Sequence, residues 1–506
     1  MPGWLGYKAY FIRVCANMKI KSLIQYGNDT PAFFIVVLTI ILAIVLGFSV
    51  AEYGVPLLDI LIKKSVSSDG GLFNLGVIFL SFIFMLFFLF FLIKGSLKTV
   101  LFLYIVALPA TYRFQGFWSI TAFAKEGDPP ELVSATTLLI FAILSVFIVK
   151  GVVLRKKNHF FGYLEYCILA FAFLGTISQF INHDLWSAFW LSIKSLWQYV
   201  ALFYLVGAAI SNEDDVKFII KAVVISILVG IVFRQGTFGL GFIFANSQGL
   251  QRIGGGAFGP AVSYGGYLSF AAILSLYLAK SSSKLWLNLL WLLATGLILF
   301  ELINTHTRGA ILSFLIVVFL VVLSKERKFI LLLIICTIFS FLLTGLWSDF
   351  LYLISERDFT LSTSILQDPN VKIRFELWAL AFPRIFDGFG FGYGIGNLIY
   401  LYTSVNREFT SHNMLLELTQ EVGAIASIFF LMFYVSVISR LLKWIKKTTL
   451  IAYLFVSLLG WFIFANTTST SIVYYYPCEA TILMYSILFS AKAITDNGGS
   501  FIGLDR

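Results

Sequence analysis

Long apolar runs recur along almost the whole chain, separated by short polar or charged stretches. A helix needs about 20 mainly apolar residues to cross the hydrocarbon core of a bilayer, and about fourteen runs come near that length, the two shortest being 98–112 and 309–323. This pattern predicts an all-α polytopic membrane protein with about 12–14 transmembrane helices and one long outer loop, 348–411. The runs are 31–51, 72–93, 98–112, 134–150, 160–181, 185–210, 217–233, 261–280, 285–304, 309–323, 328–347, 414–438, 449–466 and 472–491.

Composition supports this class and excludes others. Of the 506 residues, 59% are hydrophobic and 12% are charged, with a mean hydropathy of +0.92, whereas about 25% of a soluble domain is charged. The excess of 36 Lys and Arg over 26 Asp and Glu does not call for a nucleic-acid partner, because positive charge in a membrane protein marks the cytoplasmic side. The four cysteines form no CxxC pair or Cys/His cluster, which argues against a disulfide framework and a structural zinc site.

The positive residues also predict the orientation. Run 31–51 is longer than the apolar region of a secretory signal and lacks a clear cleavage site, so we expect a retained first span. With the N-terminus inside and the spans alternating, 23 of the 36 Lys and Arg fall on the inner side and 12 on the outer side. The inner positives cluster in short loops, where the positive-inside rule has most force. Both termini are therefore predicted to be cytoplasmic.

Three arginines are expected on the outer side. Arg252 begins a glycine-rich segment that ends at Pro260, Arg308 opens an apolar run, and Arg374 lies in the long loop close to Glu376. The planar guanidinium fork fits phosphate oxygens, so together these residues could neutralise a pyrophosphate at the membrane surface. The alternative is that they anchor spans at the interface or form ion pairs within loops.

The end of the long loop contains a candidate general base. His412 can accept a proton near neutral pH, because an unperturbed imidazole titrates at about 6.5. Asn413, Glu417 and Glu421 follow at i, i+4 spacing and share one helix face. This polar stripe could orient a substrate or the histidine, or it could be a solvated helix start. His306 is a second candidate base, although its flanking threonines also suit a helix cap.

Two further features carry possible chemistry. Glycines alternate with larger, mainly aromatic residues over 388–396. An extended segment of this kind has a bare face that a ligand or another backbone can approach, and an aromatic face for sugars or the interface; a packed loop is equally consistent. Lys194 lies inside a span, where a charge is costly and marks function by default. It could reach a lipid phosphate or pair with Glu165.

Taken in order, these motifs resemble the bacterial O-antigen ligase and O-antigen polymerase superfamily. The resemblance covers the region from Arg252 to Gly423. At the position three residues after Gly423, where the ligase pattern has Gly, Thr or Tyr, this chain has Ala426. The matching motifs are Arg252 to Pro260, Thr307-Arg308-Gly309, Arg374 with Trp378, the glycine run 388–396, and His412-Asn413 followed by Gly423.

The resemblance implies a glycosyltransferase at the periplasmic face of the bacterial inner membrane. It would move a glycan from undecaprenyl pyrophosphate to a sugar hydroxyl of an acceptor glycan or lipid A core, inverting the anomeric carbon. His412 would be the base and the three arginines would hold the pyrophosphate, so that neither a metal nor another cofactor is expected. The supporting residues would be Asn413, Glu417, Glu421, Lys194 and His306.

This interpretation divides the chain into N-terminal transmembrane helices (1–250), a catalytic region (251–440) and C-terminal transmembrane helices (441–506). Two alternatives remain open. A metal-dependent glycosyltransferase would need an acidic cluster in an outer loop, for which the segment 126–131 offers Glu126, Asp128 and Glu131. A lipid-linked oligosaccharide flippase often has internal repeats, and the sequence has no evident repeat.

Overall fold

The structure is a computed structural model of the whole chain. The chain divides into two compact units, Met1–Leu89 with Leu144–Lys156 and Phe90–Ile143 with Lys157–Arg506. Apart from the end of one helix, the described residues belong to the second unit. The structure describes residues 96–118, 135–153, 162–234, 261–305, 307–323, 369–398, 411, 413–466 and 478–501.

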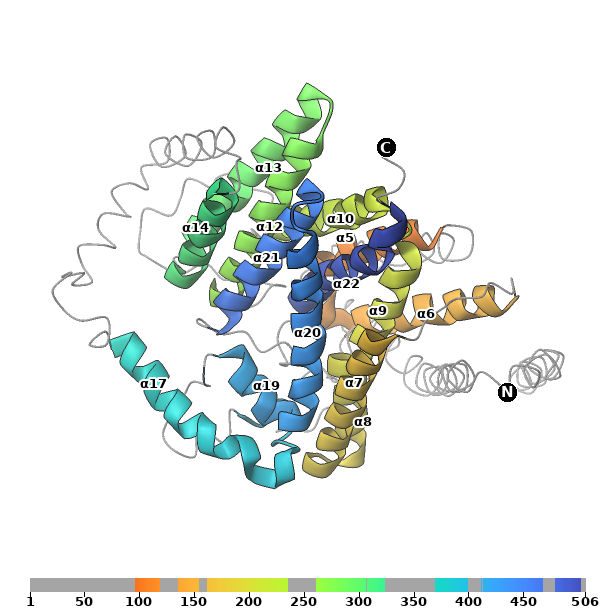
Figure 1. The fold of residues 1–506 in the computed structure, drawn as a ribbon. Helices are drawn as coiled ribbons and strands as arrows, with labels where there is room; N and C mark the ends of the chain where they lie inside the picture. The colour runs from red at the N-terminus through yellow and green to blue at the C-terminus, as the bar shows by residue number, and fades with distance from the viewer. Residues whose placement is uncertain are drawn as a thin grey trace, which may run out of the picture. The chain divides into compact units, whose positions relative to one another are not determined.

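Every regular element among the described residues is a helix (Figure 1). Helices suit a lipid-embedded chain because each satisfies its own backbone hydrogen bonds. The predicted all-α fold is confirmed. The elements are α5 (Leu97–Trp118), α6 (Ala135–Val153), α7 (Tyr163–Asn182), α8 (Leu185–Ser192), the π-helical turn η2 (Ile193–Trp197), α9 (Gln198–Ala209), α10 (Glu213–Arg234), α12 (Ala261–Ser281), α13 (Leu285–Asn304), α14 (Arg308–Leu323), α17 (Pro369–Ala381), the 3-10 helix η5 (Phe382–Gly390), α19 (Met414–Val422), α20 (Ala424–Trp444), α21 (Thr449–Phe464) and α22 (Cys478–Phe501).

Four described stretches are long and apolar enough to cross a membrane. They are α7, α13, α20 and the segment Ser187–Ala209, which runs through α8, η2 and α9. The protein is therefore a polytopic membrane protein, as predicted. The expected total of 12–14 crossings depends on residues outside the described ranges and stays a prediction. Within the predicted long loop, the structure contains α17 and η5.

The predicted single span 414–438 is wrong in one respect, because the structure breaks it into two helices. α19 ends at Val422, and α20 begins at Ala424 after Gly423, which has φ 93° and ψ 154°. Those dihedrals belong to a region that is essentially restricted to glycine. The membrane-crossing helix is therefore α20, and the nine residues of α19 precede it as a separate element.

α12 lies at the centre of the second unit and packs against α10, α13, α14 and α21. Its described residues from Tyr264 to Ala279 are buried. Two adjacent glycines let neighbours approach: the ring of Phe464 at the end of α21 lies against Gly266, and Ala310 of α14 lies close to Gly265. The start of α12, the start of α14 and the end of α21 therefore meet at one end of the unit.

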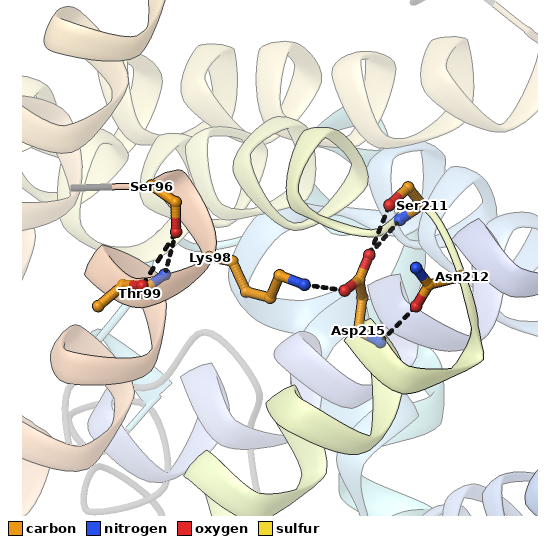
Figure 2. A network of polar contacts seen from close by, with 6 residues as sticks. All are labelled: Ser96, Lys98, Thr99, Ser211, Asn212 and Asp215. Atoms are coloured by element: carbon orange, nitrogen blue, oxygen red, sulfur yellow. Dashed lines mark hydrogen bonds and ion pairs between the residues drawn. The ribbon is translucent and has the colours of Figure 1, made fainter.

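Charged side chains tie helices together at the opposite end. Lys98 near the start of α5 pairs with the carboxylate of Asp215 in the first turn of α10 (Figure 2). The other carboxylate oxygen of Asp215 accepts hydrogen bonds from the N–H and hydroxyl of Ser211, at 2.9 and 2.6 Å. Burial raises the pKa of Asp215, but the bonds from Lys98 and Ser211 outweigh burial and hold it below its usual value.

A second charged group at that end joins three helices. Lys492 on α22 pairs with Glu165 in the first turn of α7 and lies 2.7 Å from Asp496. Asp496 also pairs with Arg440 near the end of α20. We call this the ion-pair end, defined by Lys98–Asp215, Glu165–Lys492 and Arg440–Asp496, and we call the opposite end, defined by the start of α12 and the end of α21, the site end.

Candidate active site

The glycine run 388–396 packs against the break between α19 and α20. The described glycines of the run from Gly390 onward have positive φ, between 73° and 87°. A Cβ added at Gly392 would lie 2.6 Å from the carbonyl oxygen of Gln420 and 2.7 Å from the nitrogen of Gly423. A Cβ added at Gly423 would clash in turn with Gly390 and Phe391. The sequence predicted that either a ligand or another backbone approaches the bare glycine face, and the structure shows another backbone there.

Hydrogen bonds fix this contact. The N–H of Tyr393 donates to the carbonyl of Gln420 at 2.7 Å, and the N–H of Gly394 donates to the carbonyl of Glu421 at 3.0 Å. These carbonyls belong to the last turn of α19, which has no helical donors of its own for them. The glycine run thus caps α19.

The end of α7 holds the same junction from the other side, which the sequence did not reveal. Gln179 accepts a hydrogen bond from the N–H of Ile395 at 2.7 Å, and Asn182 donates to the carbonyl of Gly392 at 3.1 Å. Ser178 donates to the carbonyl of Glu421 at 3.2 Å. These three polar residues, which we call the α7 edge, sit at the end of a run that hydropathy identifies only as a span. The sequence signal that could have identified these residues is the presence of polar side chains within a predicted span.

His183 follows the α7 edge directly. A Cβ added at Gly394 would lie 2.6 Å from its Nε2 atom, so the imidazole packs against the glycine run. Burial lowers the pKa of His183, an effect that exceeds the opposite effects of the Ile395 backbone and the Asp184 charge. His183 is therefore a neutral packing residue of the junction near pH 7. The sequence singled it out only as one of four histidines.

The start of α19 is anchored to the end of α21. Asn413 caps α19 by accepting a hydrogen bond from the N–H of Leu416 at 3.1 Å. Its amide donates to the carbonyl of Asn466 at 2.9 Å, and Asn466 accepts from the N–H of Leu415 at 3.2 Å. Asn413 and Asn466 together therefore fix the position of the helix start.

α17 holds the residue on the other side of His412. The indole N–H of Trp378 donates to the carbonyl of the buried Ser411 at 2.8 Å. His412 itself lies outside the described residues, but both of its sequence neighbours are tied to other helices. Arg374 lies in α17, one turn before Trp378.

The glutamates of α19 face protein rather than solvent. Glu417 and Glu421 are only 3% and 0% exposed. The solvated helix start that the sequence allowed is therefore wrong. These two residues therefore belong to the packed interior of the protein. A buried carboxylate is costly unless it is paired or hydrogen-bonded.

Arg308 is the first residue of α14, beside the start of α12. A Cβ added at Gly265 of α12 would lie 3.1 Å from both Oγ1 of Thr305 and Cβ of Thr307. The turn that precedes Arg308 is closed by hydrogen bonds between these two threonines, each at 3.3 Å. His306 lies outside the described residues.

The segment from Arg252 to Pro260 also lies outside the described residues. It leads directly into α12, which begins at Ala261. The start of α12, which follows this segment in the sequence, lies at the site end next to the turn that precedes Arg308.

Lys194 is buried within the π-helical turn η2. This turn packs against α7, where Trp197 donates to the hydroxyl of Thr176 at 2.9 Å. The alternative partner considered for Lys194, Glu165, contacts Lys492 with one carboxylate oxygen and the N–H of Gly162 with the other. π-Helical turns within helices are frequent at functional sites.

A metal site receives no support within the described part of the chain, where no three His, Cys, Asp or Glu residues gather as ligands. The acidic segment 126–131 lies outside the described residues, so the metal-dependent alternative is addressed by experiment below.

The geometry of the site end agrees with a sequence comparison. Residues 293–431 match the sequence profile of the O-antigen ligase family. We call this matched segment, residues 293–431, the ligase domain. The resemblance to the O-antigen ligase and polymerase superfamily is thereby confirmed. A comparison with curated proteins found no match to this chain.

The ligase domain contains several of the elements that pack at the site end. It includes the end of α13, all of α14, α17, η5 and α19, and the start of α20. The α7 edge, the start of α12 and Asn466 lie outside the matched residues, yet they contact the ligase domain directly. The ligase domain is therefore held in place by helices from both flanking parts of the chain.

Proposed function

We propose that this protein transfers a glycan from undecaprenyl pyrophosphate to a sugar hydroxyl of an acceptor glycan or lipid A core. The reaction takes place at the periplasmic face of the bacterial inner membrane, with the site end outward and both termini in the cytoplasm. The observation that carries the proposal is the meeting of motif segments within the ligase domain. The start of α19 and the start of α14 both pack at the site end, through α21 and α12.

The roles follow from the chemistry of the leaving group. A pyrophosphate leaves with its negative charge, and arginine guanidinium groups stabilise that charge by bidentate hydrogen bonds. Arg252 and Arg308 hold the pyrophosphate and Arg374 supports it from α17. No metal or other cofactor is required for this step.

His412 acts as the general base. It removes the proton from the acceptor hydroxyl, the oxygen attacks the anomeric carbon, and the pyrophosphate leaves from the opposite side, so the configuration inverts. The fixed neighbours Ser411 and Asn413 support this role, because a base must be held within hydrogen-bond reach of its proton.

The supporting residues act at different distances from this chemistry. Asn413 caps α19, and Glu417 and Glu421 are buried on the same helix. Their proposed role is to orient the substrate or His412. Lys194 and His306 are proposed to assist binding of the lipid-linked donor. The catalytic region is proposed to extend over 251–440, between transmembrane regions 1–250 and 441–506.

The test compares Arg308→Lys with His412→Ala. Lysine keeps the charge but loses the bidentate fork, and loss of a charge-assisted contact of about 1.5–3 kcal/mol slows transfer roughly tenfold to a hundredfold. His412→Ala is expected to abolish transfer. The measurement is transfer from a lipid-linked donor by purified protein, with Arg357→Lys in the long loop as a matched control that retains activity.

Three outcomes would contradict the proposal. Full activity of Arg308→Lys would indicate that this residue anchors the span, since lysine snorkels equally well. Full activity of His412→Ala would remove the base. Loss of wild-type activity in a chelator would favour the metal-dependent alternative. A flippase needs a sealed membrane between two compartments, so transfer by the wild type in detergent micelles distinguishes the enzyme from a transporter.

A further inference from the structure

The turn between α20 and α21 carries a dense positive charge. Arg440, Lys443, Lys446 and Lys447 fall within one short stretch of sequence. Arg440 is neutralised by Asp496, whereas the side chains of the three lysines are exposed and form no ion pair within the described part of the chain. We call Lys443, Lys446 and Lys447 the lysine turn. Their three positive charges are crowded together, yet the sequence between Glu421 and Glu479 contains no acidic residue.

The lysine turn lies where a lipid-facing surface ends. The exposed positions of α20 recur every three or four residues along one face, opposite a buried face that includes Phe430, Phe433 and Val437. The next position in this series is Lys446. The exposed series is Ile425, Ile428, Met432, Val435, Ser439 and Leu442.

The length of α20 sets the depth of the lysine turn. Its 21 residues span about 30 Å at 1.5 Å per residue, which is about the thickness of the hydrocarbon core. Because the apolar series ends at Leu442, the lysines that follow lie at the level of the lipid headgroups.

Trp444 adds an aromatic anchor at that level. Its ring lies 3.1 Å from the Nζ atom of Lys447, measured to the ring centroid, which is a cation–π contact. Tryptophan is enriched at membrane interfaces. The contact places one ammonium group of the turn directly against the tryptophan ring.

Other described turns at the ion-pair end are different. The first turn of α10 contains Glu213, Asp214 and Asp215, which offset nearby lysines. The turn between α12 and α13 has only Lys280 and Lys284. Positive charge without a compensating carboxylate is therefore concentrated in the lysine turn.

We propose that the lysine turn is a binding site for the headgroup of an anionic phospholipid. A phosphodiester without a compensating amine, as in phosphatidylglycerol, matches three ammonium groups that form no ion pair with any carboxylate among the described residues. A zwitterionic headgroup brings its own positive charge and is bound less well. This site lies at the ion-pair end, away from the proposed transfer site, and it does not depend on the proposed function.

The experiment measures lipid retained by the full-length protein purified in a neutral detergent. Phosphatidylglycerol and phosphatidylcholine are offered at equal concentrations, and bound lipid is counted by native mass spectrometry. The test variant is Lys443→Gln with Lys446→Gln and Lys447→Gln. The matched control removes the same charge elsewhere at the same end, by Lys221→Gln, Lys280→Gln and Lys284→Gln.

Each lysine near an anionic headgroup strengthens binding about fivefold. Because the test variant lacks three lysines, we expect it to bind phosphatidylglycerol about a hundredfold more weakly. Binding is expected to be unchanged in the control variant and in a variant with arginine at all three test positions. Phosphatidylcholine is expected to bind all variants equally, and salt is expected to weaken only the phosphatidylglycerol signal.

Two results would overturn the proposal. One is wild-type retention of phosphatidylglycerol by the glutamine variant, and the other is an equal loss in the control variant. Displacement of the lipid by inorganic phosphate at the same concentration would show that the turn binds free phosphate instead. The variant with arginine at all three test positions controls for folding. If it binds phosphatidylglycerol as the wild type does and the glutamine variant does not, the loss is due to the missing positive charge.

Discussion

At the scale of single residues, Gly423 is the position on which the site end is most dependent. Its φ of 93° with ψ of 154° excludes most side chains, and its missing Cβ makes room for Gly390 and Phe391. The two constraints are independent, since one concerns its own backbone and the other concerns the glycine run.

Gly423→Ala is expected to destabilise the protein and reduce glycan transfer. The backbone strain alone costs about 1–3 kcal/mol, and the clash with the glycine run adds to it. The measurement is the thermal midpoint of purified protein together with the transfer rate. Gly296→Ala in α13 is the control, because a Cβ there would meet nothing within 4 Å; an equal effect of both changes would contradict the explanation.

The sequence predicted part of this arrangement. Alternating glycines at 388–396 indicated a close approach, and the motif that ends at Gly423 was evident, but nothing in the sequence paired the two. The pairing of the glycine run with Gly423 is a tertiary contact between segments about thirty residues apart. Hydrophobic periodicity predicts local secondary structure and carries no information about such contacts. The buried state of Glu417 could not be predicted either, because a charged i, i+4 stripe is compatible with solvent or with protein.

At the scale of elements, the α7 edge fixes the position of the glycine run of the ligase domain through hydrogen bonds. Gln179 is fully buried, and its side-chain oxygen is the partner of the N–H of Ile395. Its amide donates to the carbonyl of Gly175 in its own helix at 3.2 Å. Hydropathy predicted α7 as a span but not this role, because it averages over the polar residues at the helix end.

Gln179→Leu is expected to lower stability by about 1–3 kcal/mol, the cost of leaving a buried N–H without a partner. The same change should loosen the glycine run and slow transfer. Thermal unfolding and transfer assays on purified protein measure both effects. Thr176→Val, one turn earlier on α7, removes a side-chain hydrogen bond to Trp197 of η2 rather than to the ligase domain, and it is expected to leave the transfer rate closer to wild type.

At the scale of the whole molecule, the described helix ends of the second unit separate into two chemical classes. The ion-pair end joins helices through charged side chains, whereas the site end joins them through glycines, amides and backbone carbonyls. The sequence-based orientation assigns all helix ends in each class to the same side of the membrane. The number of spans stays a prediction, and the boundaries of one predicted span are wrong, since run 414–438 contains α19 and α20.

The predicted orientation is tested with fused reporters. A reporter that is active only in the periplasm is expected to be active after Asp358 in the long loop and inactive after Lys447 in the lysine turn. The reason is the excess of positive residues in the short inner loops. A reporter that is active only in the cytoplasm should give the opposite result; cytoplasmic activity after Asp358 would contradict the orientation.

The two ties that flank His412 have a consequence for how such a protein can diversify. Trp378 holds Ser411 and Asn466 holds Asn413, so the two sequence neighbours of His412 are each anchored to another helix. Insertions and deletions upstream, between the glycine run and Ser411, leave both anchors in place. The segment between the glycine run and Ser411 is thus free to change length and sequence over evolution without displacing either anchor.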